Sequence, residues 1–350
     1  MKNLILIGVL VIVTSCKTSN SRNYTSDKLL ENVIAVEVSY FKKANPNTKI
    51  TVVDCTLSDG TKTKCYEIVT NSVPTDHQMG PWCPESITDD ASAGGIWLEG
   101  GKVYDVDGAF VKNMATFYDD ETWQMYDEEG NIYVTKTEED CINAANPYVG
   151  EEYKNYCVEC LPSFITEVSQ TYMIPVTPVL QKNATMFQGP PGGNQAGRPE
   201  QNGARPPRGE RPEGGGPPPR GDRGGMPSTR GIALNGVEFS APAPVDNILS
   251  AYTLAPFDDA GGHINVHQGY HYHTTTGLST KIEQEDGHAA LIGYALDGIG
   301  IYECTDASGN KAIGLDELRG HSDTTRGYHY HVDQAGANNF INGLKGAYAK

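Results

Sequence analysis

The alternation of apolar and polar residues predicts short β-strands along most of the chain. Two runs rich in β-branched residues, 50–55 and 65–70, flank a Ser-Asp-Gly turn and predict a β-hairpin. Segments 96–106 and 123–135 have the same form, each with a glycine-containing turn. After residue 231, short strand-like runs alternate with glycine-rich turns. This spacing predicts a mainly β fold of antiparallel sheets or a sandwich built from short hairpins, with a β-rich α+β fold as the alternative.

A short helix is predicted after Thr137. The Thr137 hydroxyl can cap the first turn, and the Asp140 carboxylate lies three residues further on, as in a capping box. The pair Asn146-Pro147 ends the predicted helix, because proline disfavours helical backbone in the residue before it.

The first residues have the pattern of an export signal. A short positive start precedes ten apolar residues, 4–13, and a helix of that length cannot cross a bilayer about 30 Å thick. Small and polar residues then lead to Cys16, as in the lipobox of bacterial lipoproteins. We expect residues 1–15 to be removed and Cys16 to be lipidated, which anchors the chain at the bacterial outer membrane, on its periplasmic or surface face. An ordinary secretory signal with an incidental cysteine is the alternative.

Residues 183–231 have a different composition from the rest of the chain. They hold ten of its 21 prolines, long glycine runs and seven arginines, with almost no aliphatic residues. Such a segment cannot bury enough apolar surface to offset its ordering entropy, so it is predicted to be disordered. Its arginines are candidates for contact with an acidic surface or a cell-envelope polymer, although a solvated spacer is the favoured interpretation.

Charge and cysteine content narrow the class of protein. The net charge of −17 argues against nucleic acid as a partner and fits a soluble exported protein. Export permits disulfides, and Cys55 and Cys65 flank the first predicted turn, so we expect a bond across this hairpin. Cys157 and Cys160 have redox or metal spacing, but no second Cys-x-x-Cys accompanies them, and we expect a structural bridge. With Cys16 lipidated, seven cysteines remain, so at least one is free or bonded between chains.

The strongest chemical pattern is a duplicated histidine motif. Residues 262–273 and 320–331 share the pattern G-H-x-[N/D]-x-x-x-G-Y-H-Y-H, at a constant offset of 58 residues (320 − 262). In a strand, residues two apart lie on one face, so each Tyr-His-Tyr-His run places its two histidines on one face and its two tyrosines on the other. The first histidine of each motif lies eight residues upstream across a glycine, where the chain can turn and add a third ligand.

Three histidines with an open position match a catalytic zinc site, and imidazole also suits copper, iron or nickel. We predict a divalent transition metal, zinc or copper foremost, in two three-histidine sites or one shared site. The predicted ligands are His263, His271, His273, His321, His329 and His331. Asn265 and Asp323 are candidates to orient histidine tautomers. The alternative is a half-buried strand pair without an ion, with tyrosines in the core.

With these motifs, the chain resembles the YHYH-domain family of exported proteins, which is named for the repeated tetrapeptide. The further stretches that match lie at 73–77, 172–175, 231–237, His288 with 292–298, and 320–321. The resemblance runs from about residue 50 to the end of the chain.

This resemblance implies a single module interrupted by an insertion. The implied parts are a tether at 16–48, an N-terminal part at 49–182, the insertion at 183–231 and a histidine-rich C-terminal part at 232–350. Relatives often carry cysteines where this chain has Leu318 and near Gly343, so Cys304 lacks the neighbours that the family would lead us to expect.

Three hypotheses about function follow. The first is a membrane-anchored lipoprotein that binds or buffers a transition metal. The second is a metal-dependent hydrolase or oxidase, in which an open position holds water and His77, His288 and Asp297 are candidate acid–base groups. The third is a structural or adhesion protein without an ion. The chain carries no Gly-x-Ser-x-Gly, P-loop or His-Glu-x-x-His motif, so the sequence leaves enzymatic activity open.

Overall fold

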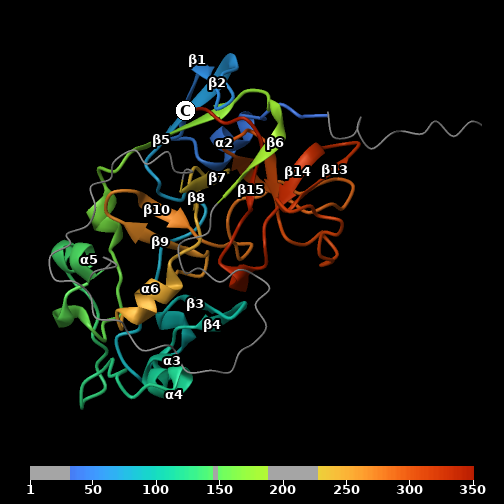
Figure 1. Cartoon of the computed structure of the whole chain (residues 1–350). Coiled ribbons are helices and arrows are strands. Elements are labelled where there is room, and N and C mark those ends of the chain that lie inside the picture. Colours follow the sequence, from blue (N-terminus) through green and yellow to red (C-terminus); the bar gives the residue numbers. More distant parts are fainter. Residues whose placement is uncertain (1–31, 145–148, 188–227) are drawn as a thin grey trace, which may run out of the picture.

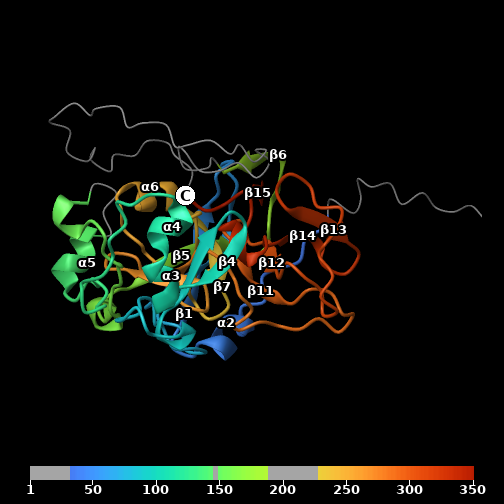
Figure 2. The same cartoon turned by 90° about the horizontal axis from the view of Figure 1, so that it is seen from below.

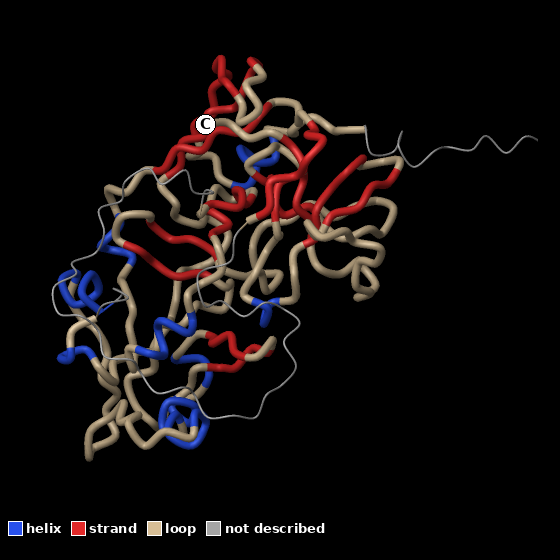
Figure 3. Tube along the Cα trace, viewed as in Figure 1, coloured by secondary structure: helices blue, strands red, loops and turns tan. Residues whose placement is uncertain are grey.

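The computed structural model of the chain describes residues 32–144, 149–187 and 228–350 (Figure 1). Its regular structure is mainly β, with short helices and long loops between the strands, which confirms the predicted fold class (Figure 3). The predicted export signal and Cys16 lie outside the described residues. No helix within the described ranges is long and apolar enough to cross a membrane.

An eight-stranded sheet forms the centre of the C-terminal part of the chain. Its strands are β7 (Thr229–Ala233), β8 (Glu238–Ser240), β9 (Gly262–Asn265), β10 (Gly269–Tyr272), β11 (Leu291–Ala295), β12 (Gly300–Tyr302), β13 (Gly320–Asp323) and β14 (Gly327–His331). The strand order is β13-β14-β12-β11-β7-β8-β10-β9. Neighbouring strands are antiparallel, as predicted, except that β10 runs parallel to β8 and β14 runs parallel to β12.

The sheet consists of two similar halves that meet between β7 and β11. Each half has a first hairpin (β7–β8 or β11–β12), a long connection, and a second hairpin (β9–β10 or β13–β14). The inner strand of the second hairpin lies parallel to the outer strand of the first. Both first hairpins carry an irregularity at the same place, between Thr229 and Gly231 and between Leu291 and Gly293. The duplicated histidine motif is therefore one part of a duplicated four-strand unit, and its two copies form opposite edges of the sheet.

The N-terminal part contributes a smaller sheet and two further strand pairs. Its strands, with their C-terminal partner, are β1 (Lys49–Thr56), β2 (Lys62–Thr70), β3 (Ile96–Glu99), β4 (Lys102–Asp105), β5 (Gln170–Pro175), β6 (Leu180–Met186) and β15 (Gly343–Gly346). Strands β1, β2 and β5 form an antiparallel sheet, and the predicted Cys55–Cys65 disulfide joins β1 to β2. Strands β3 and β4 form the second predicted hairpin.

The third predicted hairpin, 123–135, forms only in part. Its turn is present, an antiparallel bridge joins Tyr126 to Ile132, and the Tyr133 amide donates to the Met125 carbonyl at 2.9 Å, but no regular strand pair forms here among the described residues. The reason is that Ile132 donates its amide to Glu85 and Val134 pairs with Cys157, so the second arm bonds to other segments.

Two predicted boundaries shift. The predicted insertion begins inside β6, which pairs with β15, and it ends inside β7. Its central part, 188–227, lies outside the described residues. The predicted tether, 16–48, includes packed chain, because the Val36 amide donates to the Val176 carbonyl at 3.0 Å and Phe41 is fully buried.

The helices are short. The α-helices are α2 (Ser39–Ala44), α3 (Gly108–Lys112), α4 (Met114–Tyr118), α5 (Glu138–Ala144) and α6 (Val245–Ser250), and the 3-10 turns are Ala91–Ala93, Glu151–Tyr153, Pro162–Ile165 and Ala335–Ala337. In Figure 1, α3, α4, α5 and α6 lie at the lower left, on the side away from the β13–β14 hairpin. Helix α5 confirms the predicted capping box. The Asp140 amide donates to Thr137 Oγ1 at 3.1 Å, and the Thr137 amide donates to Asp140 Oδ2 at 3.1 Å.

One apolar core joins the N-terminal and C-terminal parts. Trp97 of β3 and Tyr330 of β14 are both fully buried and belong to the same cluster, together with Phe257 and Tyr272. Because this core contains side chains from both sides of the predicted insertion, the two parts pack as one unit. In Figures 1 and 2 the β13–β14 hairpin lies at the opposite end of this unit from α5.

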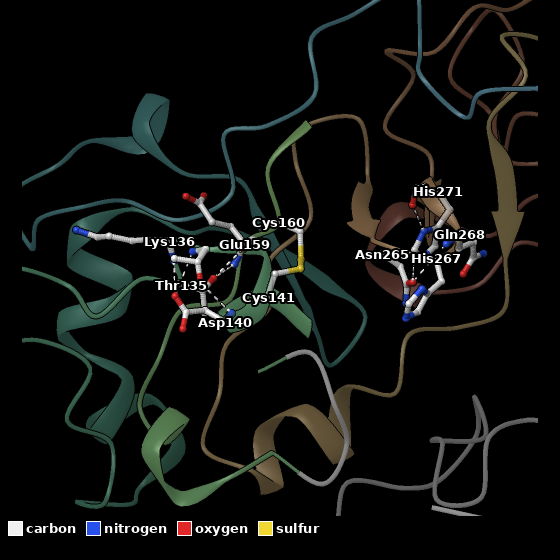
Figure 4. Close-up of a disulfide and its surroundings, with 12 residues drawn as sticks. Thr135, Lys136, Asp140, Cys141, Glu159, Cys160, Asn265, His267, Gln268 and His271 are labelled. Atoms are coloured by element: carbon white, nitrogen blue, oxygen red, sulfur yellow. Dashed lines mark hydrogen bonds between the residues drawn. A yellow bond between two sulfur atoms is a disulfide. The ribbon is translucent and has the colours of Figure 1, made fainter. Parts of the chain in front are cut away.

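Two further disulfides tie the loops around α5. They are Cys83–Cys157 and Cys141–Cys160, the second of which is shown in Figure 4. Cys157 and Cys160 are therefore structural, as predicted, but each is bonded to a distant partner and not to the other. Among the described residues, Cys304 is the free cysteine.

Candidate metal centres

The first group of histidines, the three-histidine cluster, is built on the β9–β10 hairpin. His263 of β9 lies directly opposite His271 of β10, and His273 follows at the end of β10 on the same face. His263 Nε2 lies 3.1 Å from His271 Nε2 and 3.1 Å from His273 Nε2. The hairpin thus brings three ring nitrogens to one point, as the spacing of the motif predicts.

The second group, the four-histidine cluster, repeats this arrangement on the β13–β14 hairpin. His321 Nε2 lies 3.0 Å from His329 Nε2 and 3.2 Å from His331 Nε2. A fourth ring comes from the loop before β11, where His288 Nε2 lies 3.1 Å from His329 Nε2. The ligand atoms of each cluster lie within 4.8 Å of one another.

The two clusters are separate. The β9–β10 and β13–β14 hairpins are opposite edges of the eight-stranded sheet, with four strands of the first hairpins between them. Of the two arrangements that the sequence left open, the structure therefore has two separate histidine clusters and not one shared cluster.

Main-chain carbonyl groups orient nearly all of these rings through Nδ1. The contacts are His271 with Gly269 (3.1 Å), His273 with Ala241 (2.6 Å), His288 with Ala289 (3.0 Å), His321 with Ile313 (3.1 Å), His329 with Gly327 (2.9 Å) and His331 with Glu303 (2.8 Å). A carbonyl oxygen can only accept, so each of these Nδ1 atoms carries the hydrogen. In a neutral ring the Nε2 atom then has a free lone pair, and these lone pairs converge.

The spacing of the Nε2 atoms fits a central ion. Nitrogens bound to one zinc ion at about 2.0–2.1 Å lie about 3.3–3.4 Å apart in a tetrahedron and about 2.9 Å apart at right angles. The Nε2–Nε2 distances of 3.0–3.2 Å in the two clusters lie between these values. Carbonyl groups that hold the outer nitrogens are also the usual partners of metal-bound histidines.

Burial favours the neutral form of these rings. It is the main cause that lowers the pKa of His271 to about 4 and that of His273 to about 3. In the four-histidine cluster it likewise lowers the pKa of His329 to about 4 and that of His331 to about 3. At neutral pH these rings are therefore uncharged, which is the form that binds a metal.

The tyrosines of the motif lie on the opposite face, as predicted, and anchor the strands. Tyr270 OH donates to Asp258 at 2.8 Å, and Tyr328 OH donates to Asp316 at 2.8 Å, in equivalent positions of the two halves. Tyr330 OH donates to Asp297 at 2.7 Å. The candidate acid–base residue Asp297 is thus fully buried on the tyrosine face and also accepts from the Gly346 amide. The structure gives it a scaffold role away from the histidine nitrogens.

His77 is also on the tyrosine face. Its Nδ1 lies 2.7 Å from Asp76 Oδ1, and its Nε2 lies 3.2 Å from Tyr270 OH. The Asp76 carboxylate accepts further hydrogen bonds from Asn235 and Thr280. His77 therefore contacts β10 on its tyrosine face and does not lie in either histidine cluster.

Asn265 and Asp323 stabilise the hairpin turns. Asn265 Oδ1 accepts from the amides of His267 and Gln268, as Figure 4 shows, and Asp323 Oδ1 accepts from the amide of Arg326. The predicted role in orienting histidine tautomers is thus filled by main-chain carbonyl groups.

His288 was assigned as a candidate acid–base group, and the structure places it among the ligands instead. It lies 41 residues before His329 in the chain and outside the duplicated motif, so motif spacing does not reveal it. The β7–β8 and β11–β12 hairpins align at an offset of 62 residues (293 − 231). At this offset, the residue that corresponds to His288 is Met226, which is outside the described residues.

Comparison with known proteins supports the resemblance over a narrower range than the sequence motifs implied. The family described as YHYH protein matches residues 222–312. This range contains strands β7 to β12, the three-histidine cluster and His288, and it ends before the second motif. No match was found among curated proteins or solved structures. Residues 222–312 therefore match the YHYH family, and of the second half of the duplicated unit the match includes strands β11 and β12 but not β13 and β14.

Proposed function

We propose that this chain binds two transition-metal ions, one in each histidine cluster. The observation that carries the proposal is the four-histidine cluster, in which all four Nδ1 atoms face carbonyl oxygens. Four Nε2 lone pairs that point at one another about 3 Å apart repel, and a cation between them turns this repulsion into four bonds. Without an ion, the acceptors of the two buried rings, His329 and His331, have no donor among these four rings for their lone pairs.

The donor atoms select the class of metal. Both clusters offer imidazole nitrogen only, which suits zinc, copper, nickel and iron. Calcium and magnesium prefer oxygen ligands and are not expected here. Zinc or copper is our proposal for the resident ion.

Metal content per chain tests this proposal. Protein from zinc- and copper-replete medium is expected to hold two ions, and a protein without stoichiometric metal would contradict the proposal. Joint replacement His271→Ala and His273→Ala is expected to leave one ion, as is joint replacement His329→Ala and His331→Ala. His267→Ala is the matched control, because this exposed histidine of the β9–β10 hairpin lies outside both clusters and should leave two ions.

We also propose that the protein is exported and lipid-anchored at the cell envelope. The support is the N-terminal pattern that ends at Cys16 and the three disulfides, which are typical of oxidising compartments. Cys16→Ala is expected to move the protein from the membrane fraction to the soluble exported fraction. Complete membrane retention of this variant would contradict the anchor.

A metal-dependent hydrolase or oxidase is the second candidate function. It is favoured by the incomplete ligand shells, since three or four histidines leave space on an ion that can hold five or six ligands. Two of the predicted acid–base groups, His77 and Asp297, lie on the tyrosine face. An enzyme of this class would therefore rely on the ion and its bound water.

A further inference from the structure

We infer that the four-histidine cluster holds its ion with one side open to solvent, and that this side binds a small anionic ligand. The inference rests on the proposed function, because it requires an ion in the cluster. It goes further in assigning different tasks to the two clusters.

The arrangement of the four rings is not tetrahedral. The ring centroids of His288 and His321 are 6.3 Å apart, whereas His321 and His329 are 4.6 Å apart and His329 and His331 are 5.2 Å apart. With metal–nitrogen bonds of about 2.1 Å, each centroid lies about 3.2 Å from the ion, so opposite rings are about 6.4 Å apart and tetrahedral rings about 5.2 Å apart. His288 and His321 therefore lie on opposite sides of the ion.

The other two rings leave one side of the ion free. His329 and His331 are 4.9 and 5.0 Å from His288 by ring centroid, which places both nearly at right angles to the axis through His288 and His321. The unoccupied side is then the one opposite His329 and His331. Four ligands in this see-saw arrangement leave at least one coordination position free. This position lies in the plane perpendicular to the axis through His288 and His321.

This open side faces the surface of the molecule. His329 and His331 belong to the buried strand β14, each only 1% exposed, so the side opposite them points away from the core. His288 and His321, which border it, are partly exposed. Ile313, whose carbonyl group orients His321, is 83% exposed. Solvent and small solutes can therefore reach the ion.

The three-histidine cluster differs in geometry and enclosure. Its ring centroids are 4.7, 4.9 and 4.9 Å apart, so the three rings occupy one face of the ion without an opposite pair. The fully buried Phe257 packs against His263 and His273, and its ring centroid lies 5.3 Å from the centroid of each histidine ring. An ion here is more shielded, and a bound water is expected to complete its shell.

The charge of the donor set selects an anion. All four rings of the open cluster are neutral ligands, so a divalent ion keeps its full charge. Arg326, a cationic side chain whose charge acts on His288, is paired with Asp286 and Asp323, so it does not compete for the anion. Azide is a suitable probe because it is small, anionic and binds open positions on cobalt(II) and copper(II).

Azide titration of the cobalt(II)-loaded protein tests the inference. With two cobalt ions per chain, one azide per chain is expected to change the visible absorption. The change should persist in the variant His271→Ala with His273→Ala and disappear in the variant His329→Ala with His331→Ala. Loss in the first variant and persistence in the second would overturn the assignment of the open site.

Metal content, measured separately, distinguishes failure of the proposed function from failure of this inference. Fewer than two cobalt ions in the unaltered chain would remove the basis of both, whereas two ions and no azide response would overturn the open position alone. His288→Ala provides a second readout that does not depend on azide. It should convert the see-saw cluster to a three-histidine set, and the visible absorption of cobalt should then approach that of the first cluster. Unchanged absorption would contradict the role of His288.

Discussion

At the scale of single residues, main-chain carbonyl groups decide what the histidines can do. Ala241 and Glu303 occupy equivalent places in the two halves of the sheet, and each accepts from Nδ1 of the last histidine of its motif. This contact fixes the tautomer and aims Nε2 at the cluster. Because backbone makes the contact, the identity of the accepting residue is free to differ, and it is alanine in one copy and glutamate in the other.

The pH dependence follows from the lowered histidine pKa values. Histidine in an unfolded chain titrates near pKa 6.5, whereas burial lowers the pKa of His271 and of His329 to about 4. Protons should therefore begin to displace the metal only as the pH falls toward about 4, below the value near 6.5 that free histidines would imply. Metal retained after dialysis across this range measures the effect. Half-release near pH 6.5 would show that the rings titrate as exposed histidines.

The same shifts give the metal-free protein a stability that depends on pH. Between about pH 6.5 and pH 4 the unfolded chain binds more protons than the folded chain, so the free energy of unfolding falls as the pH falls. Denaturant unfolding of the chelator-treated protein is expected to show this loss of stability with acidification.

At the scale of elements, three histidines of each cluster come from one hairpin with a glycine at its turn. Gly269 begins β10 with a positive φ of 85°, a conformation that residues with a side chain rarely adopt. A Cβ atom there would also lie 2.7 Å from the Ser72 Cβ. The turn thus accepts only glycine, and its geometry places His263 opposite His271.

Gly269→Ala is therefore expected to weaken the first metal site and spare the second. The number of tightly bound ions should fall from two toward one, with a lower melting temperature. Gly277→Ala is the matched control, because its φ of 88° imposes the same backbone strain and no atom lies within 4 Å of the added Cβ. Equal metal loss in both variants would mean that general destabilisation, and not the hairpin, controls the site.

At the scale of the whole molecule, the strands on both sides of the predicted insertion are held independently. Strand β6 pairs with β15 near the C-terminus, and β7 lies in the middle of the eight-stranded sheet. Because these strands have partners outside 188–227, we propose that this segment is a spacer.

Replacing 188–227 by a short Gly-Ser linker is expected to leave the melting temperature within a few degrees and the metal content at two. The reason is that closure entropy changes slowly with loop length, by about 0.6 kcal/mol per doubling. Thermal unfolding and metal analysis of the shortened chain provide the measurement. Loss of cooperative unfolding would mean that this segment packs on the folded domain.

The sequence by itself determined the features that depend on contacts close in the chain. The alternation within Tyr-His-Tyr-His placed histidines and tyrosines on opposite faces, and the eight-residue spacing brought His263 to His271 across one turn. The Cys55–Cys65 disulfide and the capping box of α5 are equally local. Such contacts follow from strand and helix periodicity, so they are visible without knowledge of the fold.

Only the tertiary structure decided the features that depend on strand order. It placed the two hairpins at opposite edges of one sheet, which separates the clusters, and it brought His288 from the loop before β11 to a hairpin about 40 residues later. It also placed Asp297 and His77 beside Tyr330 and Tyr270, on the face of the strands that carries the tyrosines. The physical reason is that a strand's neighbours are selected by packing of the shared core. No local spacing in the chain records that selection.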